Sequence, residues 1–261
     1  MEIQIKRAVK AGNSSAVILP RAWLNRKVRV ELAEKDSETI LIEVIGVVKK
    51  HLPLDKIIGV YLVGSYARSE QSEESDIDVM VITSDVDMNM IEEGIYNILV
   101  ISSELLNQKL DRDLLPVGQM IKEARPLINS ELLELLDVKV TKKNVKWYLE
   151  TTEDKLKIIK QVIEQAKRTG RKYLEDIVAY TLVLRIRTLH IIAKLIKNEE
   201  YSKKDFVGLI RRASGGTDAY GRYAAVKRNS EEGRGVKPEE AERLYDYLKN
   251  QLGEVKTRIS L

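Results

Sequence analysis

Two aspartates separated by one residue are the strongest candidates for chemistry in this sequence. Asp76 and Asp78 stand directly before the apolar run VMVI. Side chains two residues apart on a strand point to the same face, with Cα atoms roughly 6–7 Å apart. Two carboxylates at this spacing can hold one metal ion, or a pair of ions about 3.5–4 Å apart. Carboxylate and phosphate oxygens together favour Mg²⁺ over zinc.

A glycine and a serine precede the first aspartate, with ten residues between the serine and the aspartate. Gly64 ends the apolar run IIGVYLVG, and Ser65 begins a predicted helix. The missing side chain of Gly64 lets a phosphate approach the backbone, and a helix start favours an anion. An isolated Asp-x-Asp pair is commonplace and is often only a solvated strand edge. Here, however, two carboxylates open a buried strand, which is costly unless they are paired or bind a metal.

The elements around these residues alternate between strands and helices. The sequence predicts helices over 40–50, 65–70 and 121–136, and strands over 57–64, within 72–83 and over 96–102, with an acidic connection over 85–93. Such alternation predicts an α/β or α+β unit.

The segment LVGSYARSEQSEESDIDVMVI resembles the GSX10DXD signature of minimal nucleotidyltransferases, within the DNA polymerase β superfamily. The resemblance extends over roughly residues 45–138. It implies that Gly64, Ser65 and Arg68 bind the triphosphate of an NTP, most simply ATP, and that Asp76 and Asp78 bind Mg²⁺, with two ions expected. Such enzymes transfer a nucleoside monophosphate to a hydroxyl of a small molecule, a protein or an RNA end.

One position departs from the family pattern. Family members usually carry a third carboxylate on the next strand, which acts as a base toward the acceptor hydroxyl. The matching catalytic position in YNILVIS is Asn97, whose side chain supplies neither negative charge nor a base. Glu93 or Glu104 could supply the missing acid. The departure leaves a second hypothesis open, in which a DNA-binding regulator uses a catalytically weak core as a nucleotide sensor.

The N-terminal part, residues 1–44, is predicted to be a small β module with strands over 3–10 and 17–20. Residues 8–32 resemble the swapped-hairpin AbrB/SpoVT type of DNA-binding module. A module this small has little core of its own, which favours a homodimer. DNA binding and dimerisation alone both stay open. The basic side chains available for phosphate contacts are Lys6, Arg7, Lys10, Arg21, Arg26, Lys27 and Arg29.

The C-terminal part, residues 141–261, is predicted to be all helical, with helices over 153–168, 172–197 and 237–256. It resembles the helical domains that close over the nucleotide in many archaeal nucleotidyltransferases. Arg185 and Arg187 lie inside an apolar stripe, so each needs a partner. For both Arg185 and Arg187, the triphosphate and a structural salt bridge stay open as partners.

Two further patterns in this C-terminal part are weaker. Arg185 and His190 loosely fit the R-x4–6-H ribonuclease motif of HEPN domains, but five residues place the two side chains about 140° apart on a helix. The glycine- and arginine-rich segment 211–235 suits either RNA or an acidic partner, or a solvated loop.

Composition and charge limit the remaining classes of function. The chain has no cysteine and two histidines, which argues against disulfides, thiolate chemistry and a multi-histidine zinc site. It has no apolar run of 18 residues, so a soluble cytoplasmic protein is expected. Residues 51–139 hold seventeen acidic and seven basic side chains, whereas residues 140–261 hold twenty-seven basic and seventeen acidic. We therefore expect a nucleotidyltransferase core over 45–140 between a β module and an all-α domain, with an acceptor that could be a protein in an antitoxin-like role.

Overall fold

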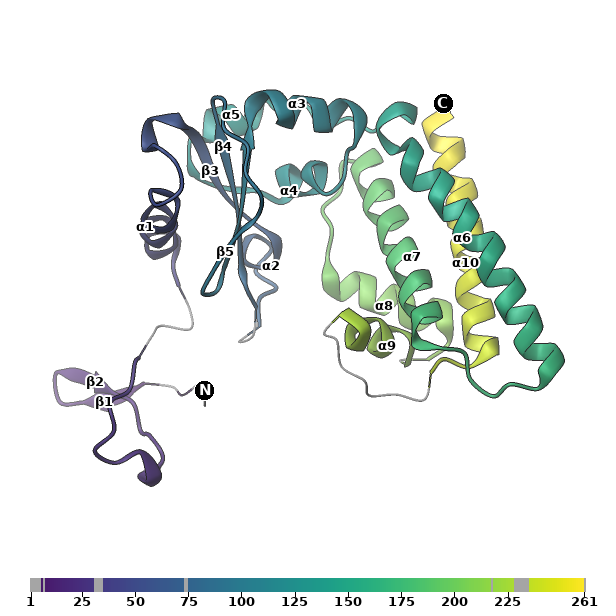
Figure 1. Ribbon diagram of the computed structural model, residues 1–261, viewed down its shortest axis with the longest axis horizontal. Helices are drawn as coiled ribbons and strands as arrows, with labels where there is room; N and C mark the ends of the chain where they lie inside the picture. The colour runs from purple at the N-terminus through teal and green to yellow at the C-terminus, as the bar shows by residue number, and fades with distance from the viewer. Residues whose placement is uncertain are drawn as a thin grey trace.

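A computed structural model describes residues 6, 8–30, 35–72, 75–216, 218–227 and 235–260. It has a mixed α/β architecture with a five-stranded sheet, a two-stranded hairpin and a C-terminal group of helices (Figure 1). The predicted fold class, an α/β core with a small β part before it and helices after it, is confirmed.

The N-terminal hairpin consists of two short antiparallel strands. They are β1 (Val9–Ala11) and β2 (Ser14–Ala16), followed by a single 3-10 turn (Arg21–Trp23). None of residues 8–30 is buried. The predicted strand over 17–20 is not formed, and half of the predicted strand over 3–10 lies outside the described residues.

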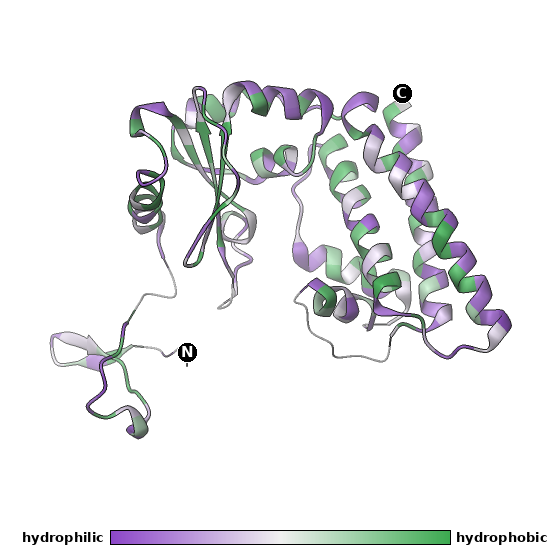
Figure 2. Cartoon of the chain, viewed as in Figure 1, coloured by the Kyte–Doolittle hydropathy of each residue, from purple (hydrophilic) through white to green (hydrophobic). Residues whose placement is uncertain are grey.

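The central sheet is mixed, with strand order β5-β6-β4-β3-β7. Its strands are β3 (Ile57–Val63), β4 (Ile77–Thr83), β5 (Ile91–Glu93), β6 (Tyr96–Ser102) and β7 (Arg125–Ile128). Strands β4 and β6 pair in parallel, and the other pairs are antiparallel. The three predicted strands correspond to β3, β4 and β6, and their apolar residues colour the sheet green in Figure 2.

Helices cover both faces of the sheet. The helix α1 (Ser37–Val48) begins at its N-cap Asp36 and packs on the face that carries Ile77 and Val79. The helices α3 (Ser103–Arg112) and α4 (Val117–Glu123) pack on the other face, which carries Met80. Because side chains alternate along a strand, Asp78 shares the face of Met80.

The predicted helix over 121–136 is wrong in its middle. The chain leaves α4 at Glu123, forms β7, and then forms a short helix α5 (Ser130–Leu135). Pro126 lies within β7, where it lacks an N–H for a ladder; β7 is an edge strand, so this costs no pairing on its free side. The predicted connection over 85–93 likewise contains the short strand β5.

The C-terminal helices enclose a separate hydrophobic core. They are α6 (Lys142–Thr169), α7 (Asp176–Ile196), α8 (Lys203–Ser214), α9 (Asp218–Lys227) and α10 (Pro238–Ser260). The all-α prediction is confirmed, and α9 falls within the segment 211–235 that the sequence left open. Across the described residues, no helix has the length and apolar character needed to span a membrane.

Candidate active site

Asp78 and Asn97 are neighbours near the N-terminal ends of the strands β4 and β6. They are register partners on the parallel strands β4 and β6, so their side chains share one face. The Asn97 amide Nδ2 donates a long hydrogen bond of 3.4 Å to Asp78 Oδ1. Asn97 therefore lies next to Asp78, on the neighbouring strand.

The two aspartates differ in their surroundings. Asp76 is exposed just before β4, whereas Asp78 is half-buried on the strand. Burial raises the pKa of the Asp78 carboxyl, and the nearby charge of Asp76 adds to this. The positive charges of Lys227 and Arg68 act in the opposite direction without reversing the shift. Two carboxylates that repel each other beside a buried strand form a place where a cation would relieve the repulsion.

Gly64 is needed for a reason that the sequence did not show. Its φ is +70°, and a Cβ there would overlap Asp78 Oδ2. The space left by the missing side chain is thus filled by the Asp78 carboxylate. Only glycine combines this backbone conformation with such a close approach.

We expect Gly64→Ala to lower the rate of any reaction at Asp78 by about 10²-fold, because the new methyl group displaces the carboxylate. Left-handed backbone also costs alanine about 1–2 kcal/mol, so the melting temperature should fall. Gly94→Ala is the matched control, since Gly94 has φ +65° but no atom within 4 Å of an added Cβ. Equal losses in the two variants would contradict the role of the Asp78 contact.

Arg68 and the Gly64 N–H are engaged by protein carboxylates. Glu123 on α4 accepts from both, while Ser65 stays half-buried at the start of the four-residue helix α2 (Gly64–Ala67). Nothing in the sequence pointed to Glu123, because its contact with Gly64 depends on how α4 packs against the sheet.

Neither glutamate that the sequence offered as the missing acid lies in the row of Asp78 and Asn97. Glu93 is bonded to Lys50 at 2.5 Å, and its position on β5 puts it on the opposite face from Asn97. Glu104 lies in the first turn of α3, bonded to Gln108. The register instead pairs Glu92 with Asn97 across β5 and β6. Glu92 is exposed, and it lies in one cross-strand row with Asn97 and Asp78. The sequence alone does not reveal this row, because it depends on which strands pair and in which register.

The helical part brings Arg187 rather than Arg185 toward the sheet. The Arg185 guanidinium donates to Thr151 Oγ1 at 2.9 Å and lies over the Trp147 ring, so its described contacts are all on α6. The Arg187 guanidinium lies 5.6 Å from the ring centre of Tyr201, the same ring that Arg68 contacts from the other part of the chain. Burial disfavours its charge, but the Tyr201 and Tyr223 side chains outweigh this and raise the pKa of Arg187.

Lys227 is a further cation near Asp78, and it comes from the segment 211–235, which the sequence left open between RNA, an acidic partner and a solvated loop. It ends α9, and its charge acts on Asp78 from the helical part. His190, by contrast, packs against Phe206 at 5.7 Å, away from the α6 contacts of Arg185. The loose ribonuclease pattern is therefore not assembled by these two side chains.

The donor set suits a hard cation that the nucleotide helps to hold. Asp76 and Asp78 offer carboxylate oxygens and Asn97 offers an amide oxygen, which is the chemistry Mg²⁺ prefers. No group of three or more acidic or histidine side chains able to hold a metal occurs among the described residues. Additional ligands would have to come from phosphate or water.

The sequence of the central part matches a known family. Residues 43–134 match the family model described as "Polymerase beta, Nucleotidyltransferase". These residues carry the second half of α1, the whole central sheet and both aspartates. No curated protein matches the chain significantly.

Solved structures similar to the chain include three with low overall scores. The spectinomycin adenyltransferase AAD(9) from Enterococcus faecialis, with ATP and spectinomycin, is 14% identical, with 81% of this chain and 99% of that chain covered and a TM-score of 0.41. A nucleotidyltransferase-like protein from Exiguobacterium sibiricum is 15% identical, with coverages of 85% and 75% and a TM-score of 0.34. A toxin-antitoxin structure with AMP-PNP is 19% identical, with coverages of 46% and 96% and a TM-score of 0.26. All three scores lie below 0.5, so the candidate site rests on the residues above and on the family match.

Proposed function

We propose that the polymerase beta-type core transfers a nucleoside monophosphate from an NTP, most simply ATP, to an acceptor hydroxyl. The observation that carries this proposal is the half-buried Asp78, which lies against Gly64 with Asp76 and Asn97 beside it. A half-buried carboxylate with a raised pKa and an adjacent second carboxylate is suited to bind a divalent cation together with phosphate oxygens.

Each residue of the site has a proposed role. Asp76 and Asp78 would hold Mg²⁺, which supplies charge neutralisation at the phosphates when bound. The Ser65 hydroxyl would donate to a phosphate oxygen, and Lys227 and Arg187 would offset phosphate charge from the helical side. We assign no triphosphate contact to Arg185, because its described contacts lie on α6.

The chemical step would be a displacement at the α-phosphorus. The acceptor oxygen forms a bond to this phosphorus as the bond to the pyrophosphate oxygen breaks, and pyrophosphate leaves. The acceptor proton must go to a base, and Asn97 cannot take it. Glu92, in register with Asn97 and exposed, is the carboxylate that the sheet offers on the same face. Incubation with α-labelled NTPs, Mg²⁺ and candidate protein, RNA and small-molecule acceptors tests this function directly.

The lack of charge at Asn97 favours a second candidate function, nucleotide sensing by a DNA-binding regulator. In that case the wild-type protein would bind Mg·ATP without transferring label to any acceptor. Nucleotide binding would then change the affinity of the N-terminal part for DNA. A gel-shift titration with and without Mg·ATP separates this candidate from the enzyme.

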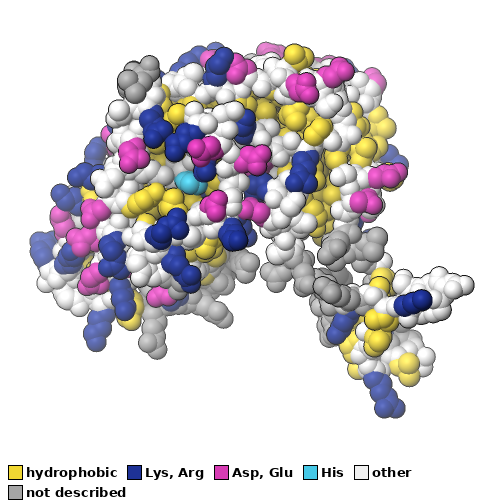
Figure 3. Space-filling view, turned by 180° about the vertical axis from the view of Figure 1, so that it is seen from behind, with side chains coloured by type: hydrophobic (Ala, Val, Ile, Leu, Met, Phe, Trp, Pro, Cys, Tyr) yellow, Lys and Arg dark blue, Asp and Glu magenta, His cyan; other side chains and the backbone are white. Residues whose placement is uncertain are grey.

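We also propose that the N-terminal hairpin pairs with the hairpin of a second copy. A two-stranded hairpin is marginally stable on its own, and this one leaves its apolar side chains on the surface (Figure 3). The exposed apolar side chains of this part are Val9, Ile18, Leu24, Val28 and Val30. The basic side chains of the same part remain candidates for DNA phosphates, although Arg7 lies outside the described residues.

Removal of residues 1–35 should halve the particle mass measured by light scattering, because the apolar hairpin surface is lost. This end point keeps α1 and its cap Asp36, whose side chain accepts from the Thr39 N–H at 2.8 Å. Ile18→Ser combined with Leu24→Ser should have the same effect in the full-length chain. A mass that both changes leave intact would exclude this surface as the dimer contact.

A further inference from the structure

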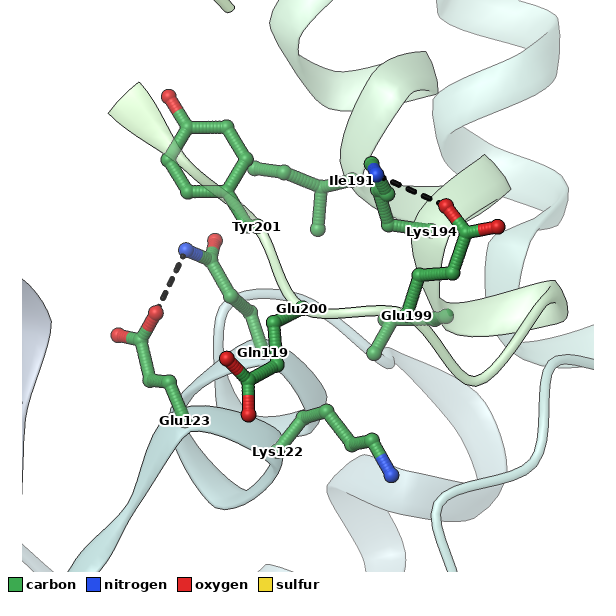
Figure 4. A pocket seen from close by; sticks show the side chains of 9 residues that line it. Gln119, Lys122, Glu123, Ile191, Lys194, Glu199, Glu200 and Tyr201 are labelled. Carbon is green, nitrogen blue, oxygen red and sulfur yellow. Dashed lines mark hydrogen bonds and ion pairs between the residues drawn. The ribbon is translucent and has the colours of Figure 1, made fainter. Parts of the chain in front are cut away.

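The carboxylate of Glu123 connects the two ends of the turn after β3. It accepts from the Gly64 N–H at 2.8 Å and from Arg68 Nη1 at 2.5 Å. Gln119, one turn earlier on α4, donates to the same carboxylate at 3.2 Å (Figure 4). Only 7% of the Glu123 side chain is exposed, so water competes little for these bonds. The Gly64 N–H is therefore already satisfied by the protein.

Arg68 is held between two carboxylates. Besides Glu123, it donates through Nε to Glu70 Oε2 at 2.9 Å, and its guanidinium lies 5.3 Å from the centre of the Tyr201 ring. Burial disfavours the charge of Arg68, but Glu123 and Glu70 outweigh it and raise the pKa. With both carboxylates bound and 13% of its side chain exposed, Arg68 is directed to protein groups rather than to a ligand.

Glu70 carries this chain of contacts into the helical part. Its carboxylate accepts from Ser202 Oγ at 2.9 Å and from the Lys203 N–H at 2.9 and 3.0 Å. Ser202 is the N-cap of α8, where the helix dipole favours a negative charge. Burial alone would raise the pKa of Glu70, but Arg68, Lys203 and Ser202 lower it overall. The contacts run without a break from Gly64 to the first turn of α8.

An alternative interpretation is that Glu123 occupies the place of a nucleotide phosphate. A bound nucleotide would then displace Glu123 from the Gly64 N–H and the Arg68 guanidinium. The energies argue against this interpretation. Separating a buried charge from its partner costs about 3–5 kcal/mol, whereas micromolar binding supplies about 8 kcal/mol in total. Displacement of Glu123 would consume roughly half of that binding free energy. We therefore expect Glu123 to keep its bonds to Gly64 and Arg68 when a nucleotide binds.

We propose that Glu123 is a positioning residue for the nucleotidyltransferase site, acting through Gly64, Arg68 and Glu70. By holding Gly64 it fixes the turn that includes Ser65, and this turn lies against Asp78 at Gly64. By holding Arg68, which holds Glu70, it fixes α8 and with it the side of the helical part that faces the sheet. Gly64 and Arg68 then serve as framework rather than as phosphate ligands. This inference rests on the proposed function for its catalytic consequence, but the contacts themselves do not depend on it.

The experiment uses the full-length chain with Glu123→Gln and Glu123→Asp. Glu150→Gln is the matched control, because Glu150 is an exposed glutamate on α6 that lies 3.7 Å from Lys146. Three quantities are measured well below the melting temperature: amide hydrogen exchange of residues 64–68 without ligand, the Kd of Mg·ATP, and kcat/KM for label transfer. We expect Glu123→Gln to speed exchange of residues 64–68 and to lower kcat/KM by about 10²-fold, as a misplaced site would. Glu123→Asp should fall between Glu123→Gln and wild type, and Glu150→Gln should change none of the three quantities.

Two results would overturn the proposal. Tighter Mg·ATP binding by Glu123→Gln would show that the carboxylate competes with phosphate. Unchanged exchange over residues 64–68, with or without a lower melting temperature, would show that Glu123 does not hold the turn. If wild-type protein transfers no label to any acceptor, the proposed function fails on its own, while exchange and the Kd of Mg·ATP still decide the positioning role.

Discussion

Asp78→Asn should lower NMP transfer by about 10³-fold or more. The substitution removes an anionic ligand from the proposed cation site, so the several kcal/mol of charge stabilisation that a bound metal contributes are lost. Each loss of about 1.4 kcal/mol lowers the rate tenfold. Transfer of α-labelled ATP, measured over a range of Mg²⁺ concentrations, gives the loss. Asp85→Asn is the control, because Asp85 lies just beyond the other end of β4 and forms an exposed ion pair with Lys56 at 2.6 Å. Asp76→Asn should behave like Asp78→Asn, and wild-type transfer by either would disprove the assigned site.

Asp78→Asn should leave the folded protein as stable as wild type or more stable. In the folded protein the pKa of Asp78 is raised, first by burial and then by Asp76. Ionising this carboxyl therefore costs folding free energy at every pH above its unfolded pKa of about 3.9. Asparagine removes that cost, so the free energy of unfolding without metal at pH 7 should equal or exceed that of wild type. The difference should vanish as the pH falls below the unfolded pKa, which denaturant titrations at several pH values can measure.

Asn97→Asp should raise transfer by about 10²–10⁴-fold if the lack of a base limits the wild-type rate. The new carboxylate would replace an amide that now donates to Asp78 Oδ1 at 3.4 Å. It would also place a third negative charge beside Asp78, so Mg²⁺ should bind more tightly while the metal-free protein becomes less stable. Calorimetric titration with Mg²⁺ and the label-transfer assay measure the two effects.

Asn107→Asp provides the control for this charge change, because Asn107 is exposed on α3. The comparison with Glu92→Gln separates two possibilities for the base. If Glu92 takes the acceptor proton in wild type, Glu92→Gln should lose activity and Asn97→Asp should restore part of it. Unchanged Mg²⁺ binding and rate in Asn97→Asp would mean that position 97 does not face the reacting groups.

The central sheet was largely predictable because its signals are local. Apolar runs bounded by glycine and polar residues predicted β3, β4 and β6. Alternation predicted a shared face for Asp76 and Asp78, whereas only the family resemblance pointed to Asn97 on the next strand. The strand β7 was missed because Arg125 and Pro126 look like a break between helical patterns, and only an edge position makes a proline strand acceptable.

The contacts around the candidate site were less predictable because they join distant segments. Gly64 and Glu123 are 59 residues apart, and no periodic pattern relates them. The choice between Arg185 and Arg187 also needed the packing of α7, since two residues on a helix turn the side chain by about 200°. The sequence indicated that both arginines need partners. The partners are Thr151 and Trp147 for Arg185, and Tyr201 and Tyr223 for Arg187.

The bond between Glu70 and the start of α8 also limits how this chain could have been assembled by recombination. Glu70 contacts Ser202 and Lys203, which lie 132 and 133 positions further along the chain, where the part with the sheet meets the C-terminal helices. A different helical segment joined after residue 141 would have to present a helix N-terminus, with its free N–H groups, at the same point. Otherwise the Glu70 carboxylate would lose its hydrogen bonds to Ser202 and Lys203 and would keep Arg68 as its remaining described partner. Exchange of C-terminal segments among related cores is therefore restricted to those that supply such an end.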